Sequence, residues 1–431
     1  MVINRWLHSV LDAGRRLLPE SITRSGDRDA LSKLEALCKT LISSRGEAMG
    51  TALASEALKA YHALSVEQRT EFFFKLLANF GARETDVRAA IENYLDEPSG
   101  DRAIALHHAT EAPRQMLFRR LNMAPKGTYA VVKMRSDLLR LLKQHSDLKS
   151  VDADLQHLMI SWFNPGFLEL KEINWRTSAL VLEKLIAYEA VHSMTGWEDL
   201  QRRLAEDRRC FAFFHPAVPD EPLIFVEVAL TSGIANSVDQ LLNEAVDPSA
   251  AAKADTAIFY SISDCQPGLK GISFGNFLIK QVVFELKQEL PNLQRFSTLS
   301  PIPGFSRWLF DEQREQPLED AESEQFAPYF DPDSEAAQDP AAITALMKLS
   351  RHYLKQAKRD LYPFDPVARF HLRNGAALGA CHWSADSSAR GKKQSAGIMV
   401  NYIYEIDQVE ERHEQFVNHG EIAVIPRNRR A

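Results

Sequence analysis

Apolar residues in the first third of the chain recur at intervals of three and four, the spacing of a helix that buries one face. In one segment these positions are Leu31, Leu34, Leu37, Cys38, Leu41 and Ile42. Ser65 and Gln68 have the spacing of a capping box, which predicts a helix start just before an apolar run. No convincing alternating strand pattern interrupts this part. Residues 1–150 are therefore predicted to form a helical bundle domain, suited to oligomerisation or scaffolding.

Beyond residue 151 the pattern changes to short β-rich runs separated by helical stretches. The predicted strands are Cys210–Phe214, Leu223–Leu230, Thr256–Ser263, Arg295–Leu299, Ala376–Trp383, Met399–Tyr404 and Glu421–Ile425. The predicted helices among them are Ser178–Val191, Asn276–Leu290 and Ala341–Lys358. This alternation indicates one mixed sheet with helices around it. The predicted fold class is α+β, with an all-α bundle followed by an α/β domain over residues 151–431.

One segment of the second domain, residues 311–339, has an unusual composition. It holds eleven acidic residues and a single basic one, Arg314, together with three prolines. Such a stretch is predicted to be a solvated insertion that buries little. The chain carries a net charge of −7 from 51 basic and 58 acidic residues, so the remainder holds 50 basic and 47 acidic residues. A nearly balanced surface without a basic stripe argues against nucleic-acid binding and presents no general barrier to an anionic ligand.

The cysteines and the apolar runs predict where the protein resides. The four cysteines are far apart, and no CxxC pair or HExxH motif suggests a metal site. They are expected to be reduced, buried thiols. No apolar run reaches the roughly 18 residues that would predict a membrane span, and no secretory signal is recognisable. The cytoplasm is therefore expected, with the mitochondrial matrix as the alternative because the first segment is amphipathic and contains arginines.

A glycine-rich stretch joins the predicted strand Thr256–Ser263 to the following helix. Gly268, Gly271 and Gly275 would let backbone N–H groups converge near a helix N-terminus, where an anionic phosphate is favoured. The spacing matches neither the Walker A motif nor the GxGxxG motif of dinucleotide-binding folds. Glycine spacing alone leaves a phosphate cradle and an ordinary strand-to-helix turn equally open.

Three polar residues fall where chemistry is conceivable. Ser300 ends a predicted strand, and the prolines that follow it restrict its backbone. His371 is predicted at a loop-to-strand entry. Glu227 interrupts an apolar strand, where a carboxylate must face water or find a donor. Each also has an ordinary explanation, as a turn residue, a structural histidine and an edge position.

Several long strings, taken together, resemble the malonyl-CoA decarboxylase family. In chain order they are Phe213-Phe214-His215-Pro216, Phe225 to Thr231, Gly268 to Lys280, Ser297 to Phe305, His371 to Ala376 and Asn401 to Tyr404. The resemblance extends from about Trp162 to Glu405. The helical first third contains no comparably diagnostic string.

The resemblance implies a catalytic domain of the GNAT acyltransferase fold, in which coenzyme A enters where two neighbouring strands part. It implies Ser300 and His371 as the catalytic pair, with Tyr404, Glu227 and Asn374 in supporting positions. The residues that it implies for binding the CoA ester are Gly268, Lys270, Gly271, Ile272, Ser273, Phe274, Gly275 and Asn276.

The activity implied by the resemblance is a carboxy-lyase reaction of fatty acid metabolism, from malonyl-CoA to acetyl-CoA and CO2. No metal or other cofactor is expected, because the thioester carbonyl itself accepts the electrons. A homo-oligomer, either a dimer or a tetramer, is expected from the apolar helical domain. Two other functions stay open at this point: a GNAT-type CoA-dependent acyltransferase and a non-enzymatic sensor of acyl-CoA.

Overall fold

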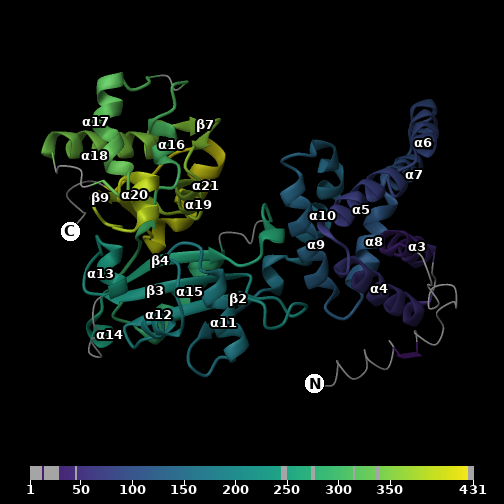
Figure 1. The fold of residues 1–431 in the computed structure, drawn as a ribbon, viewed down its shortest axis with the longest axis horizontal. Helices are drawn as coiled ribbons and strands as arrows, with labels where there is room; N and C mark the ends of the chain where they lie inside the picture. The colour runs from purple at the N-terminus through teal and green to yellow at the C-terminus, as the bar shows by residue number, and fades with distance from the viewer. Residues whose placement is uncertain are drawn as a thin grey trace. The chain divides into compact units, whose positions relative to one another are not determined.

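The amphipathic segments of the first third form a series of helices in the computed structural model, which describes residues 12–13, 29–43, 46–243, 250–272, 277–313, 316–334 and 339–425. These helices are α3 (Ala30–Ser43), α4 (Glu47–His62), α5 (Val66–Asn79), α6 (Glu84–Asp96), α7 (Gly100–Thr110), α8 (Pro113–Asn122), α9 (Gly127–Leu141) and α10 (Lys149–Trp162) (Figure 1). The predicted stripe on α3 is buried at five of its six positions, so an apolar face does hold this helix in place.

The predicted capping box is present at the start of α5. The Ser65 hydroxyl accepts a hydrogen bond from the Gln68 backbone N–H at 3.2 Å, and the Gln68 side chain accepts one from the Ser65 N–H at 3.0 Å. Two backbone donors that the helix itself cannot satisfy are thereby paired. This part of the sequence prediction is confirmed.

The described residues divide into two compact units. The first unit takes the described residues of 1–169, 214–221 and 266–274, and the second takes the rest of the chain. The first unit is therefore mainly the helical bundle, joined by two short segments that come from much later in the sequence. One of these segments contains the short 3₁₀ helix η3 (Pro267–Leu269), which belongs to the glycine-rich stretch.

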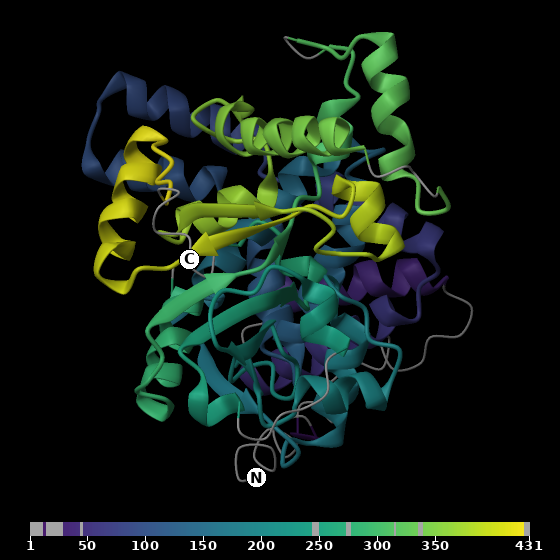
Figure 2. The same cartoon turned by 90° about the vertical axis from the view of Figure 1, so that its left-hand side faces the viewer.

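The second unit is built on an eight-stranded sheet. Its strands are β1 (Glu169–Ile173), β2 (Arg208–Phe214), β3 (Ile224–Thr231), β4 (Thr256–Asp264), β5 (Arg295–Thr298), β6 (Ser300–Pro301), β9 (Ala377–His382) and β10 (Met399–Ile403). The order is β1-β2-β3-β4-β5-β10-β6, with β9 also paired to β10. Strands of this sheet are drawn as arrows in Figure 2, coloured from teal to yellow along the chain. Strands β2, β3 and β4 are antiparallel neighbours, whereas β4 and β5 run parallel. The predicted α+β class, with a helical part followed by one mixed sheet, is confirmed.

Helices surround this sheet on a chain that alternates between the two kinds of element. They are α11 (Ala179–Tyr188), α12 (Trp197–Arg203), α13 (Val238–Asn243), α14 (Ala250–Lys253), α15 (Phe277–Glu289), α16 (Phe305–Leu309), α17 (Asp320–Phe330), α18 (Pro340–Gln356), α19 (Pro366–Arg373), α20 (Ala389–Ser395) and α21 (Val409–His419). A small hairpin of β7 (Lys358–Arg359) and β8 (Tyr362–Pro363) lies apart from the main sheet. None of the described helices is long and apolar enough to cross a bilayer.

The apolar runs located β2, β3, β4, β5, β9 and β10, whereas β1, β6 and the small hairpin were not predicted. The prediction of a strand at Glu421–Ile425 is wrong, because this segment makes only an isolated bridge between Leu378 and Val424. Its bridge consists of two backbone hydrogen bonds with Leu378, which donates to the Ala423 carbonyl at 2.8 Å and accepts from the Ile425 N–H at 2.9 Å. All four cysteines lie in the described part of the chain, are buried and form no disulfide, as predicted.

The parallel pair β4 and β5 separates after four residues. Their pairing runs from Thr256 opposite Arg295 to Phe259 opposite Thr298, after which β4 continues alone on this side to Asp264. The neighbouring chain instead breaks at Leu299 and continues as β6, which pairs with β10. The sheet is therefore open beside the second half of β4.

The prediction that the acidic segment buries little is wrong for its middle part. Helix α17 lies within it, opened by a capping box between Glu319 and Glu322. Its residues Phe326, Tyr329 and Phe330 are buried, and the Phe330 ring lies 6.0 Å from that of Phe305 in α16. Aromatic side chains spaced three and four apart thus anchor a helix whose other faces carry the charge.

The glycine-rich stretch is held against α9 inside the first unit. The buried guanidinium of Arg135 donates to the carbonyls of Gly268 and Lys270 at 2.7 and 2.9 Å, and it pairs with Asp152 at 2.7 Å. A Cβ atom on Gly268 would lie 1.9 Å from the carbonyl oxygen of Val132. Close approach to a helix backbone therefore explains the glycine at position 268.

Replacing Gly268 by alanine is expected to destabilise the protein by about 1–3 kcal/mol, because the added methyl group overpacks a backbone contact that has no room to yield. Urea unfolding at neutral pH measures this. Gly100→Ala is the matched control, since nothing lies within 4 Å of the Cβ position there. Equal stability of the two variants would contradict the packing argument.

Candidate active site

The opening beside β4 forms a cavity of about 330 Å³ within the second unit. It is lined by residues of β3, β4, β6, α19 and the loop after α11: Val191, Ile224, Phe259, Tyr260, Ser261, Ile262, Asp264, Ser300, Pro301, Pro366, Val367, Phe370 and His371. Most of these side chains are apolar, and a few polar groups converge among them. This composition is typical of a site for a small organic group.

Ser300 and His371, 71 positions apart in sequence, meet in this cavity. The Ser300 Oγ lies 3.2 Å from Nε2 of His371, and the Tyr404 hydroxyl lies 2.8 Å from Nδ1 of the same ring. The Tyr402 ring stacks on the imidazole with centroids 4.7 Å apart and planes 23° apart. Three residues named from the sequence, Ser300, His371 and Tyr404, are thus brought together in one hydrogen-bonded chain.

Burial determines the charge state of these hydrogen-bonded residues. Desolvation lowers the pKa of His371 to about 3, so the imidazole is neutral at neutral pH. Burial also raises the pKa of Tyr404 well above its ordinary value, so its hydroxyl keeps its proton. A neutral imidazole has one N–H and one lone pair, and it can donate on one side while it accepts on the other. The arrangement is suited to passing a proton rather than storing a charge.

His371 is carried by helix α19, so its predicted position at a loop-to-strand entry is wrong. Asp365 caps this helix: one carboxylate oxygen accepts from the N–H groups of Val367 and Ala368 at 3.0 and 2.9 Å. Pro366 occupies the first helical position, where its missing N–H costs nothing. The dipeptide Asp365-Pro366 is a helix-start pattern that would have located α19 from the sequence.

The second oxygen of Asp365 connects α19 to the loop that follows Ser300. It accepts hydrogen bonds from the Gly304 N–H and the Tyr353 hydroxyl, both at 3.4 Å. Gly304 is required for this approach, because a Cβ there would lie 2.2 Å from the Tyr353 oxygen. One buried carboxyl group therefore holds the helix of His371 and the loop of Ser300 in a fixed relation.

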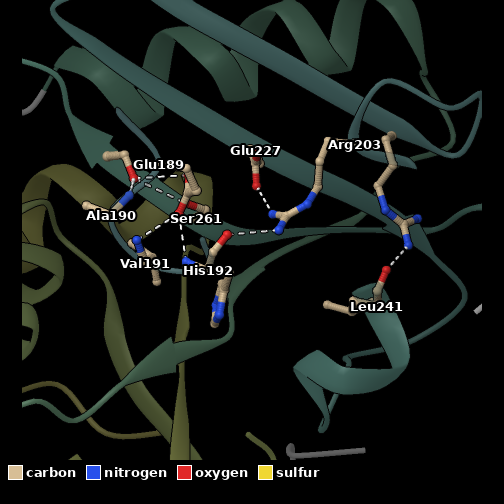
Figure 3. Close-up of polar contacts among 10 residues, drawn as sticks. Glu189, Ala190, Val191, His192, Arg203, Glu227, Leu241 and Ser261 are labelled. Carbon is tan, nitrogen blue, oxygen red and sulfur yellow. Dashed lines mark hydrogen bonds and ion pairs between the residues drawn. The ribbon is translucent and has the colours of Figure 1, made fainter. Parts of the chain in front are cut away.

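The loop after α11 forms another wall of the cavity and is held by buried polar contacts (Figure 3). The Glu189 carboxylate accepts from the N–H groups of Val191 and His192, both at 2.7 Å, and from the Ser261 hydroxyl of β4 at 2.9 Å. The Arg203 guanidinium donates to the His192 carbonyl at 3.0 Å. Sequence reasoning missed Glu189 and Arg203, because nothing local marks either residue as buried.

Glu227 pairs with Arg203 and does not line the cavity (Figure 3). It is fully buried in the middle of β3, where burial raises its pKa and the neighbouring Arg203 guanidinium opposes that rise. An edge position facing water is therefore excluded for this carboxylate. Glu227 contacts Arg203, which in turn holds the wall loop through the His192 carbonyl. Glu227 therefore lies behind the wall of the cavity.

The other residues named from the sequence lie elsewhere. Asn374 follows the last turn of α19, and its side-chain amide donates to the Phe370 carbonyl at 2.7 Å. Gly268, Lys270, Gly271 and Ile272 belong to the first unit, whereas Ser300 and His371 belong to the second. Ser273, Phe274, Gly275 and Asn276 lie outside the described residues. Among the described residues, no group of three or more His, Cys, Asp or Glu side chains is placed to hold a metal ion.

Two family models match consecutive parts of the chain. A model of the malonyl-CoA decarboxylase C-terminal domain matches residues 166–430, and one of the N-terminal domain matches residues 80–163. The chain belongs to the malonyl-CoA decarboxylase family. The resemblance inferred from the sequence strings is thereby confirmed, and the family is one of carboxy-lyases.

Individual members of the malonyl-CoA decarboxylase family match over much of the chain. The mitochondrial malonyl-CoA decarboxylase of the goose Anser anser anser is 39% identical over 318 residues, which cover 67% of this chain and 63% of the goose protein. That of Mus musculus is 34% identical and covers 79% of this chain and 77% of its own length. The crystal structure of malonyl-CoA decarboxylase from Rhodopseudomonas palustris is 45% identical with a TM-score of 0.88, covering 94% of this chain and all of that one.

The contribution of the buried Arg203–Glu227 pair to the stability of this malonyl-CoA decarboxylase family member can be tested by substitution. Arg203→Met should destabilise the fold by about 3–5 kcal/mol, because it leaves a buried carboxyl group without its partner, and Arg203→Met with Glu227→Leu should recover most of that loss. Urea unfolding of the single and double variants measures both. Arg88→Met removes an exposed pair with Glu84 and should have far less effect. A double variant no more stable than Arg203→Met would count against the argument.

The buried carboxyl group of Asp365 makes the stability of the protein depend on pH. Desolvation raises its pKa to about 6, so the folded state binds its proton more tightly than the unfolded chain does, where the pKa is about 3.9. Stability from this group is therefore complete below about pH 4 and is lost as the pH rises through about 6. Asp365→Asn cannot titrate and resembles the protonated form.

The free energy of unfolding of the unaltered protein, relative to Asp365→Asn, should rise on the order of 1–3 kcal/mol between pH 7 and pH 4. Asp339→Asn is the matched control, because Asp339 also caps a helix before a proline but is only partly buried. Parallel pH profiles for the unaltered protein and Asp365→Asn would show that the carboxyl group is not protonated in this range.

Proposed function

We propose that this protein converts malonyl-CoA to acetyl-CoA and CO2, with Ser300 and His371 as its catalytic residues. Membership of the malonyl-CoA decarboxylase family supports the reaction. The observation that carries the residue assignment is the chain Ser300–His371–Tyr404, which lies at a cavity where two strands of the sheet part. In the GNAT fold, coenzyme A is expected to enter where two neighbouring strands part, so the thioester of a CoA ligand would lie at this separation.

The reaction requires an electron sink and then a proton. When the bond between the α-carbon and the carboxylate breaks, CO2 leaves and its bonding electrons form an enolate with the thioester carbonyl. Hydrogen-bond donors aimed at the developing oxyanion lower this barrier, because they act where charge appears. Among the donors that line this cavity, we assign this role to the Ser300 hydroxyl and the N–H of the neutral His371 ring.

Protonation of the α-carbon follows along the same chain of residues. A thioester enolate is far more basic than an alkoxide or a phenolate, so a hydroxyl group is acidic enough to protonate it. Ser300 gives its proton to carbon and takes one from Nε2 of His371, while Nδ1 receives the Tyr404 proton. A proton from solvent restores Tyr404, and the net reaction consumes one proton for each CO2 released.

The apolar walls favour the loss of CO2. Val191, Phe259 and Phe370 lie around the polar pair, so a carboxylate bound beside them is deprived of water while the uncharged product is not disfavoured. No cofactor is assigned a role, because the thioester supplies the electron sink. The CoA portion is proposed to bind the segment from Gly268 to Asn276, whose first residues Arg135 holds in place.

The compartment and the assembly of the protein are part of the proposal. Buried thiols are compatible with a reducing environment, which we propose is the cytoplasm, with the mitochondrial matrix as the alternative. A homo-oligomer, a dimer or a tetramer, is proposed for the apolar helical part. Sedimentation of the purified protein tests the second point.

Ser300→Ala and His371→Asn are each expected to lower kcat by about 10²–10⁴-fold, because each removes one step of the proton relay. Binding of acetyl-CoA, measured by calorimetry, should change little in either variant. Ser43→Ala and His107→Asn, at exposed positions in the first unit, are the matched controls. A kcat near that of the unaltered protein in either site variant would refute the assignment.

One assay distinguishes the proposed reaction from its competitors. Malonyl-CoA labelled at the free carboxyl carbon should give labelled CO2 and stoichiometric acetyl-CoA without any acceptor. Free CoA that appears only with an added amine would instead indicate an acyltransferase. Ligand binding without any turnover would indicate a sensor.

A further inference from the structure

The strand that carries Ser300 is broken one residue before it. Ser297 of β5 lies opposite Ile403 of β10, and Ser300 of β6 lies opposite Val400, so both pieces follow the same neighbour. Between them, Leu299 turns away from β10 and donates its N–H to the Phe259 carbonyl at 3.1 Å. Irregularities of this kind re-aim side chains and are common beside functional sites.

The break removes a backbone acceptor from the ladder beside β10, and the Thr298 side chain takes its place. Its Oγ1 accepts a hydrogen bond from the Tyr402 backbone N–H at 3.0 Å. In an unbroken ladder, a backbone carbonyl would serve such a donor. The Thr298 carbonyl is instead taken by the Asn401 side-chain amide at 2.7 Å. The break is therefore stabilised by side-chain hydrogen bonds.

The same oxygen of Thr298 also accepts a hydrogen bond from the Ser300 hydroxyl. Ser300 Oγ donates to Thr298 Oγ1 at 2.9 Å. A serine hydroxyl has one hydrogen, so its contact with His371 Nε2 at 3.2 Å must use an oxygen lone pair. The ring then donates from Nε2, and Nδ1 accepts from the Tyr404 hydroxyl at 2.8 Å. All three hydrogen bonds run in one direction, from Tyr404 through His371 and Ser300 to Thr298.

We infer that Thr298 is the positioning residue of this site: by accepting a hydrogen bond from the Ser300 hydroxyl, it keeps His371 in the tautomer that carries its hydrogen on Nε2. Thr298 does not line the cavity and acts through Ser300. Its second contact supports the same geometry, because the residue whose N–H it accepts, Tyr402, stacks on the His371 ring. The effect on turnover rests on the proposed function, whereas the hydrogen-bond arrangement does not.

Loss of this acceptor has a definite consequence. Without Thr298 Oγ1, the nearest acceptor for the Ser300 hydrogen is His371 Nε2. The imidazole hydrogen then moves to Nδ1, where it faces Tyr404, and the direction of the relay is reversed. Proton delivery should suffer while the cavity walls, and hence substrate binding, stay as they are.

The first test is kinetic and uses valine and serine at the same position. Thr298→Val keeps the shape of the side chain without its hydroxyl and should lower kcat about 10–100-fold with KM within about twofold, as expected for a misplaced catalytic group. Thr298→Ser keeps the acceptor and should restore most of the turnover. Thr344→Val, at an exposed helical position of the second unit, is the matched control. A normal kcat in Thr298→Val, or no recovery in Thr298→Ser, would overturn the inference.

The second test reads the tautomer directly and needs no substrate. Nitrogen-15 spectra of protein labelled at histidine distinguish a protonated Nε2 from a protonated Nδ1, and the His371 signals are identified by their loss in His371→Asn. The unaltered protein and Thr298→Ser should show hydrogen on Nε2, and Thr298→Val should shift toward Nδ1. Hydrogen on Nδ1 in the unaltered protein would overturn the inference whether or not Thr298→Val folds. If CO2 release fails but the tautomers are as expected, the proposed function is wrong and this inference stands.

Discussion

The separation of β4 from its parallel neighbour is the constraint on which the rest of the site depends. Four paired residues hold the two strands together, and the chain beyond them breaks at Leu299 and joins β10 instead. Buried N–H and C=O groups in a sheet need partners, and at the break itself other groups supply them. Leu299 donates across to Phe259, and the side chains of Thr298 and Asn401 complete the β10 side. The cavity and the direction of Ser300 both follow from that break.

The buried ion pairs near the opening lie behind its walls. The pair of Arg203 with Glu227 and the contacts of Glu189 fasten the wall loop from behind. The reacting pair, Ser300 and His371, is neutral at neutral pH, and the carboxyl group among the lining residues, Asp264, is exposed to solvent at the end of β4. This division has a physical reason, because an uncompensated charge inside the cavity would attract water and would also repel or over-stabilise a carboxylate. Fixed ion pairs provide rigidity at a distance, while neutral donors and acceptors are left free to exchange a proton.

The sequence predicted most elements here because helix and strand spacing is a local property. The stripe on α3, the capping box of α5 and the apolar runs of β3 and β4 were all visible without neighbours. The helix of His371 was missed although Asp365-Pro366 marks its start, because its eight residues are too few to show a period. The aromatic anchors of α17 were hidden by the surrounding charge. The roles of Arg203 and Thr298 could not be predicted, since each depends on a partner that only the folded sheet brings near.

A decarboxylation site must satisfy two demands that conflict. Loss of CO2 is favoured by an apolar cavity without water, but the enolate that remains needs a proton that ultimately comes from water. A charged general acid in the cavity would meet the second demand and defeat the first, since it would draw solvent in with it. A chain of neutral groups avoids the conflict, because Tyr404, His371 and Ser300 can each pass a proton without holding a charge in the resting state. Such a chain works only if every member points the same way. Thr298 sets that direction by accepting the Ser300 hydrogen bond in the resting state, and the same hydrogen is the one given to the α-carbon during the reaction.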